Sequence, residues 1–226
     1  MKPNKKSSIA LILIIGLATF LFSGCKKDAI QSGIVDIDGN RYDTVSIGTQ
    51  TWMVENLKTT RYNNGDPIQS TDGDWSGLTV GAQCGYNNDA ANVTSYGRLY
   101  NWYAVSDARK IAPTGWHVPT DDDWVVLTTF LGDEWGAGDK LKESGLNHWL
   151  GTNKLGTNEV GFTALPGGNR KADGSFYGMG GMGYWWSSTE NEPTTAWIRS
   201  IYFSGASLSK SSNTKSFGFS VRCIKD

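Results

Sequence analysis

Hydrophobic and small or polar residues alternate along the C-terminal part of this chain. Phe217, Phe219, Val221 and Cys223 occupy every second position. Successive side chains of a strand point to opposite faces, so this stretch predicts a strand with one apolar face. Residues 197–203 alternate in the same way and predict a second strand. The polar faces of such strands offer many hydrogen-bonding groups and few catalytic ones, which indicates a recognition surface.

Alternating runs also begin the folded part of the chain. Residues 34–37 and 42–47 flank an Asp-Gly-Asn sequence at 38–40. Asp-Gly between apolar runs predicts a hairpin, because glycine accepts a positive φ. The same segment resembles the start of a calcium loop, but its twelfth position, Ile47, is not the glutamate that such a loop uses. Residues 50–56 predict a third short strand.

Two segments follow the helical period instead. Residues 95–107 carry tyrosine and leucine side chains at i, i+3, i+4 and i+7, which predicts a helix. A second helix is predicted to begin after Thr120, because three aspartates follow this hydroxyl and favour the positive end of a helix. It is predicted to end at Gly132. Residues 63–95 and 136–182 are rich in glycine, asparagine and aspartate and predict long loops.

Composition fits one loop-rich domain. The 226 residues include 10 tryptophans and 28 glycines, so a ring-rich core must be combined with many tight turns. The formal net charge is −1. Nothing in the sequence forms the basic stripe that nucleic acid requires, so no nucleic-acid partner is expected.

The N-terminus is typical of a targeting segment. Three lysines precede an apolar run at 9–22, which is shorter than the roughly 20 residues of a bilayer span. The run ends in Leu-Phe-Ser-Gly-Cys, which resembles the lipobox of bacterial lipoproteins. The sequence therefore predicts a signal peptide at 1–24, lipidation of Cys25, a tether at 25–33 and a domain at 34–226. A plain secretory signal and a short membrane anchor are the alternatives.

Six sequence blocks carry a family resemblance. They occur in the order DIDGNRYDTVSIGTQTWMVENLKT, YGRLYNWYAV, PTGWHVPTDDDWVVL, NEVGFTALPGGNR, YWWSSTE and GFSVRCIKD. Together they resemble the Fibrobacter succinogenes major paralogous domain, a family common in lipoproteins of Bacteroidetes. This family is allied to C-type-lectin-like folds. The resemblance implies an α+β fold in which two helices flank a small twisted antiparallel sheet, with long glycine-rich loops over one edge.

Two cysteines remain once Cys25 is lipidated. An envelope compartment permits a disulfide, and we expect Cys84 and Cys223 to be bonded, with two separate buried thiols as the alternative. Members of the family often carry a cysteine directly before Pro-Thr-Gly-Trp, where this chain has Ala112. If the family's cysteine usually pairs with the one near the C-terminus, this departure implies that Cys223 lacks its usual partner.

The sequence supports no catalytic site. His117 and His148 are the two histidines, and Ser187 lacks the G-x-S-x-G context of a hydrolase. The aspartates at 121–123 are better explained by helix capping than by a glycosidase carboxylate pair. Calcium binding at 190–193 competes with a simple polar turn, because the order of ligands differs from that of sugar-binding lectins. We therefore expect a protein that is not an enzyme, with no metal site and no cofactor.

Recognition is the expected function. The lectin-like domain of a lipid-anchored protein, held on the outer membrane or cell surface, would bind an extracellular glycan or protein. Aromatic rings would stack on the ligand and serine or asparagine would satisfy its hydroxyls. The alternatives are a structural or fimbria-like surface subunit and, third, an uncharacterised enzyme. The expected ligand-binding residues are Trp186, Ser188, Glu190, Asn191, Ser200, Tyr202 and Asn213.

Overall fold

A computed structural model describes residues 31–151 and 156–226 of the chain, together with Met1. The expected signal peptide and Cys25 lie outside the described residues. In the described part, no helix is long and apolar enough to cross a membrane.

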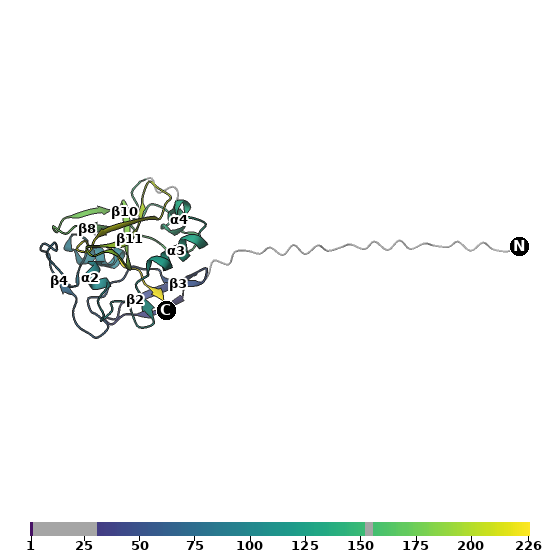
Figure 1. Cartoon of the computed structure of the whole chain (residues 1–226). Helices are drawn as coiled ribbons and strands as arrows, with labels where there is room; N and C mark the ends of the chain where they lie inside the picture. The colour runs from purple at the N-terminus through teal and green to yellow at the C-terminus, as the bar shows by residue number, and fades with distance from the viewer. Residues whose placement is uncertain (2–30, 152–155) are drawn as a thin grey trace.

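A curled five-stranded antiparallel sheet joins the two ends of the described chain (Figure 1). Its strand order is β1 (Gln31–Val35), β2 (Arg41–Ile47), β3 (Gln50–Met53), β13 (Ile224–Lys225) and β7 (Trp116–His117). The hairpin predicted at Asp-Gly connects β1 to β2, and Gly39 has a φ of +85°. The strand that ends the chain therefore lies inside a sheet begun by the N-terminal hairpin.

Three smaller sheets complete the strand structure. The largest is antiparallel and consists of β10 (Met182–Glu192), β11 (Thr195–Tyr202) and β12 (Ser209–Thr214). It includes the strand predicted at 197–203. The others are formed by β4 (Gln69–Ser70), β5 (Ala82–Cys84) and β6 (Leu99–Tyr100), and by β8 (Gly167–Arg170) and β9 (Phe176–Met179).

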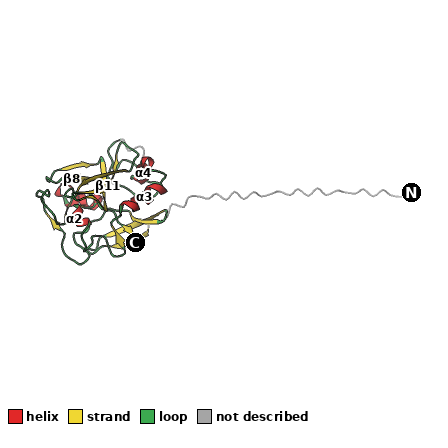
Figure 2. Ribbon diagram, viewed as in Figure 1, coloured by secondary structure: helices red, strands yellow, loops and turns green. Residues whose placement is uncertain are grey.

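The helices are short. The elements are the 3₁₀ turn η1 (Tyr86–Asn88) and the helices α1 (Ala90–Tyr96), α2 (Trp102–Val105), α3 (Asp121–Phe130) and α4 (Glu134–Leu141). Figure 2 shows α3 and α4 near one side of the domain and α2 nearer the other. The start predicted for α3 is confirmed, because the Thr120 hydroxyl and the Asp123 carboxylate form a capping box.

The helix predicted at 95–107 is wrong. Gly97, with a φ of +74°, ends α1, and an added Cβ there would lie 2.7 Å from Asn56. Leu99 and Tyr100 then pair with β5 as a strand, and α2 begins only at Trp102. Tertiary pairing overrides the local helical pattern here.

The predicted fold class is also wrong. Strands make up 34% and helices 17% of the structure, which is mostly β with several sheets rather than two helices flanking one small sheet. The predicted strand at 217–223 is instead a bridging segment. Phe219 pairs singly with Tyr100, and Ser220 pairs singly with Trp185. Both faces of this segment are buried, because Ser220 and Arg222 are as inaccessible as their apolar neighbours.

A buried polar hub ties the C-terminal segment to the first sheet. The Asn56 side-chain oxygen accepts hydrogen bonds from Arg222 Nε at 3.2 Å, Arg222 Nη2 at 2.9 Å and Trp185 Nε1 at 2.9 Å. The Asn56 amide nitrogen donates to the Tyr96 carbonyl at 2.8 Å. Burial lowers the pKa of the Arg222 guanidinium to about 9. The buried guanidinium of Arg222 is therefore stabilised in the core by neutral oxygen acceptors.

The expected disulfide is absent from the structure. Cys84 and Cys223 are both free and buried. Their side chains pack in different hydrophobic clusters, Cys84 with Trp75 and Leu99, and Cys223 with the larger group around Tyr100. The prediction of a Cys84–Cys223 bond is therefore wrong, and the alternative of two separate thiols holds.

Candidate functional site

Two of the expected ligand-binding residues are inside the core. Trp186 is 0% and Ser200 2% exposed, and the Trp186 indole N–H donates to the Tyr100 carbonyl at 2.7 Å. Neither side chain can contact a ligand without unfolding of the surrounding strands. The alternation along β10 and β11 does not reveal that both faces of this sheet are covered.

Three other expected residues lie together at one end of β10–β12. Glu190 and Asn213 both lie opposite Ala196 in the strand register. Glu190 forms an ion pair with Lys215 Nζ at 3.0 Å, and Asn191 Nδ2 donates to the Thr195 hydroxyl at 3.1 Å. These polar groups are engaged in local contacts that stabilise the turn.

Tyr202 lies at the opposite end of the same sheet. It is 37% exposed, and its ring meets that of Tyr184 edge-on, with centroids 6.2 Å apart. Ser188 lines a separate cavity of about 260 Å³ beside His117. The structure thus distributes the accessible members of the expected set over three places and forms no common site from them.

His117 is held by two carboxylates. Its Nδ1 lies 2.7 Å from Asp226 Oδ1 and its Nε2 lies 3.1 Å from Asp123 Oδ2. Both ring nitrogens are therefore occupied, which links β7 to the start of α3. Among the described residues, no group of three or more histidine, cysteine or carboxylate side chains could hold a metal ion.

A surface tryptophan outside the set expected from the sequence lies beside the sheet of β10, β11 and β12. Trp135, on the first turn of α4, is 72% exposed, more than any other aromatic side chain among the described residues. It borders a cavity of about 180 Å³, and we call this site the tryptophan pocket. Its lining residues are Glu134, Trp135, Ser207, Ser209 and Lys210.

The cap of α4 fixes Trp135 in place. The Asp133 carboxylate accepts hydrogen bonds from the backbone N–H of Trp135 at 2.9 Å and of Gly136 at 3.0 Å. An aspartate at this position satisfies two free donors of the first turn and favours the helix dipole. The exposed indole therefore projects from an ordered helix start.

Close backbone packing brings the serines to this helix. An added Cβ on Gly138 would lie 2.6 Å from the carbonyl oxygens of Ala206 and Ser207, so only glycine allows this approach. The Leu208 N–H donates to the Glu134 carbonyl at 2.8 Å. Together these contacts place the 206–209 segment against the first turns of α4.

Lys210, which lines the tryptophan pocket, belongs to a charged cluster. Lys210 Nζ lies 4.0 Å from the centroid of the Trp197 ring and 2.8 Å from Asp121 Oδ2. Asp121 Oδ1 also contacts Arg199 at 2.7 Å, and Arg199 is only 3% exposed. Burial raises the pKa of Asp121, but hydrogen bonds from Lys210 and Arg199 outweigh this effect and the pKa is lowered. Asp121 is thus a fixed anion that positions Lys210.

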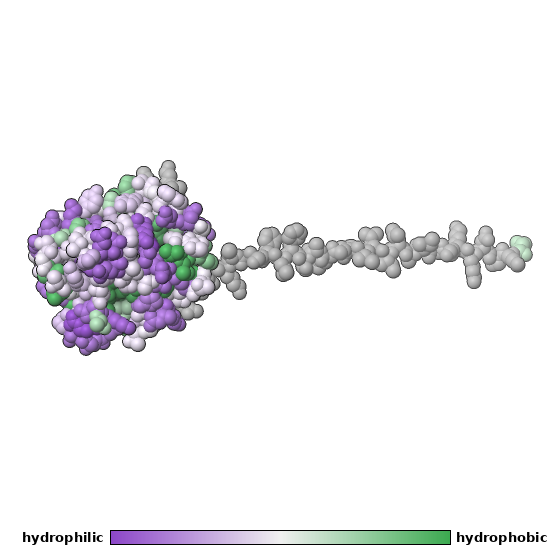
Figure 3. Space-filling view, viewed as in Figure 1, coloured by the Kyte–Doolittle hydropathy of each residue, from purple (hydrophilic) through white to green (hydrophobic). Residues whose placement is uncertain are grey.

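The tryptophan pocket combines the parts of a small polar-ligand site. An exposed indole can stack on an apolar ligand face, while hydroxyl and ammonium groups beside it can bond polar substituents. Figure 3 shows a face on which polar residues dominate and apolar residues form small areas. The sequence signal was weak, because Trp135 lies in a Gly-Asp-Glu-Trp-Gly context with no apolar residue at i+3, i+4 or i+7.

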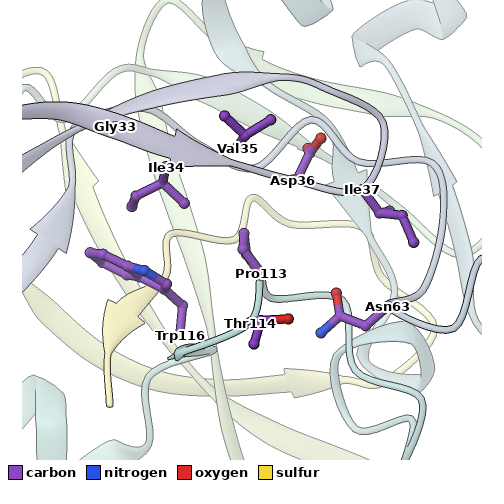
Figure 4. A pocket seen from close by; sticks show the side chains of 9 residues that line it. All are labelled: Gly33, Ile34, Val35, Asp36, Ile37, Asn63, Pro113, Thr114 and Trp116. Atoms are coloured by element: carbon purple, nitrogen blue, oxygen red, sulfur yellow. The ribbon is translucent and has the colours of Figure 1, made fainter.

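A second and larger cavity, of about 450 Å³, lies between β1 and the 113–116 turn (Figure 4). Ile34 points toward Trp116 across it, and Asn63 and Thr114 lie at its rim. The Asp36 carboxylate at its wall is already occupied by four donors, which come from Asp38, Asn40 and Tyr42. This cavity therefore presents no free charge from Asp36.

These features define a β-rich domain with surface cavities and a tightly bonded interior. The model of the Fibrobacter succinogenes major domain matches residues 45–225, and the chain belongs to this family. Comparison with curated proteins and with solved structures finds no match.

Proposed function

We propose that this protein is a cell-envelope binding module whose tryptophan pocket binds an extracellular glycan. The observation that carries the proposal is the 72% exposure of Trp135 beside the Ser207 and Ser209 hydroxyls and the Lys210 ammonium. Recognition thus stays with the sheet of β10, β11 and β12, but its centre lies at β12 rather than at the turn near Glu190.

A saccharide suits this arrangement because its two kinds of surface match those of the pocket. One face of a sugar ring presents C–H groups that pack on an aromatic ring, and its rim presents hydroxyls that donate and accept hydrogen bonds. A cavity of about 180 Å³ is small, which favours one sugar unit at a chain end or side branch rather than a long segment.

We also propose that the protein is lipid-anchored through Cys25 on the outer membrane or cell surface. The support is the lipobox-like Leu-Phe-Ser-Gly-Cys sequence after a short apolar run. Cys25→Ala should abolish labelling by a fatty-acid analogue and release the protein from membranes. Continued labelling of this variant would refute the anchor without affecting the pocket proposal.

The pocket is tested with a glycan array probed by the full-length protein in mild detergent. Trp135→Ala should weaken binding to any recognised glycan at least tenfold, about 1.4 kcal/mol. Its stability should change by no more than about 0.5 kcal/mol, because the side chain is exposed. Tyr177→Ala is the matched control, since Tyr177 is a 54% exposed aromatic residue on β9, outside the pocket.

The result also separates the two ends of the sheet. If Trp135→Ala binds normally while Tyr202→Ala or Glu190→Ala does not, the binding site lies elsewhere on β10–β12. If no glycan binds wild-type protein above background, the ligand class is wrong.

A further inference from the structure

The two edge strands of the curled sheet face the same cavity. β1 and β7 are the first and last strands in the order β1-β2-β3-β13-β7. Residues 33–35 of β1 and Trp116 of β7 both line the cavity of about 450 Å³ shown in Figure 4. The sheet therefore curls toward closure and leaves a gap between its edges. Ligand pockets typically enclose about 300–1,000 Å³, so the gap is large enough for a ligand.

One wall of the gap carries backbone groups that have no partner within residues 31–151 and 156–226. The Asp36 N–H donates to the Asn40 carbonyl at 3.0 Å, so the Asp36 backbone faces β2 as in a hydrogen-bonded position of the ladder. Bonded and non-bonded pairs alternate in an antiparallel ladder, which makes Ile34 and Tyr42 the next bonded pair. The intervening Val35 therefore directs its N–H and C=O away from β2, toward the free edge of β1.

The opposite wall supplies packing and further polar groups. Trp116 is half-buried, and Figure 4 shows Ile34 pointing toward it across the gap. The Asp226 N–H donates to the Gly115 carbonyl at 3.1 Å, so the ladder with β13 alternates in the same way and turns the Trp116 carbonyl outward. Asn63 and Thr114 add side-chain polar groups at the rim.

We propose that this gap binds an extended peptide segment of a partner protein, which pairs with Val35 as an added strand. Its backbone N–H and C=O satisfy those of Val35, and one apolar side chain packs between Ile34 and Trp116. Its neighbouring side chains point to the other face, toward solvent. The site and its ligand class differ from those of the tryptophan pocket, and the proposal does not depend on it.

The size of the gap favours a linear segment over a second folded copy. If a second copy paired its own edge strand with β1, the next strand of that copy's sheet would also have to fit beside β1. The 113–116 turn already occupies that side of the gap. A saccharide would satisfy the rim groups but offers no alternation of donor and acceptor along a strand. A cation is disfavoured, because the Asp36 carboxylate is fully engaged.

The test uses an array of terminally blocked pentapeptides in two groups. The central residue is valine or leucine in the first group and aspartate in the second. Full-length protein in mild detergent should bind the first group and not the second. Val35→Pro should weaken binding at least tenfold, whereas Val35→Ala should bind as wild type. Proline is tolerated on an edge strand whose N–H is free, so Val35→Pro should keep the melting temperature.

A second measurement does not depend on the folding of any variant. Bound peptides methylated on the backbone nitrogens that face β1 should lose affinity at least tenfold, and unmodified peptides should slow hydrogen exchange of the Val35 amide. Equal binding to Val35→Pro and Val35→Ala, or to methylated and unmethylated peptides, would overturn the proposal. Self-association that disappears in Val35→Pro would assign the edge to a second copy and would overturn it as well. Trp135→Ala should leave peptide binding unchanged.

Discussion

Replacing Asn56 with alanine should destabilise the protein by about 3–5 kcal/mol. Its side-chain oxygen, in a residue only 3% exposed, accepts from both Arg222 and Trp185. Hydrogen bonds to a charged group contribute about 1.5–3 kcal/mol and neutral ones about 0.5–1.5 kcal/mol. The two Arg222 contacts share one acceptor and count as little more than one bond. The remainder comes from leaving a buried guanidinium with fewer acceptors.

Asn56→Asp distinguishes this electrostatic explanation from simple loss of packing. The carboxylate keeps the acceptor for Arg222 and Trp185 and adds an opposite charge, while the bond to the Tyr96 carbonyl is lost. Asn56→Asp should therefore be more stable than Asn56→Ala.

Urea unfolding followed by tryptophan fluorescence measures both variants, provided that the slope of free energy against urea stays constant. Asn64→Ala, on an exposed turn, is the control and should change stability by no more than about 0.5 kcal/mol. A loss below about 1 kcal/mol in Asn56→Ala, or an Asn56→Asp variant less stable than Asn56→Ala, would refute the reasoning.

Two further predictions concern other buried groups. Asp121→Asn leaves Arg199 buried without its anionic partner and should cost about 3–5 kcal/mol, whereas exposed Asp122→Asn should be nearly neutral in urea unfolding. Folding lowers the pKa of Asp121, so its carboxylate stabilises the folded state above the unfolded carboxyl pKa of about 3.9, and this contribution is lost as the pH falls below that value. The free energy of unfolding of Asp121→Asn should therefore decrease less in acid than that of the wild type. Burial raises the pKa of Cys84 to about 12 and also raises that of Cys223, so both should resist iodoacetamide in native protein. Both should alkylate after denaturation without reductant, and a mass two hydrogens lower would contradict the free thiols.

The parts of the fold that the sequence predicted correctly are those determined by contacts between residues close in the sequence. The hairpin at 38–40 and the cap at Thr120 depend on contacts within a few residues, and both are present. The helix predicted at 95–107 fails because Gly97 packs against Asn56 and the following residues join β5, which are contacts with distant parts of the chain.

The candidate site was harder to predict for a related reason. Alternation assigns two faces to a strand but does not say which of them another element covers, and Trp186 and Ser200 are both covered. Trp135 gives no periodic signal, because its importance comes from exposure. The pocket beside it also needs the close approach of Gly138 to Ala206 and Ser207, which lie far along the chain.

The position of β13 has a consequence for how the chain folds during synthesis. β3 and β7 meet only through β13, at Ile224 and Lys225, so the first sheet cannot be completed until the last residues have been made. Such long-range pairing is slow, because the long intervening chain must close into a loop before any stabilising contact forms. Until then the N-terminal hairpin would keep an open strand edge, and incomplete chains would be prone to aggregate. A chaperone that binds exposed strands should therefore associate with nascent chains that stop before residue 224 and release those that are complete.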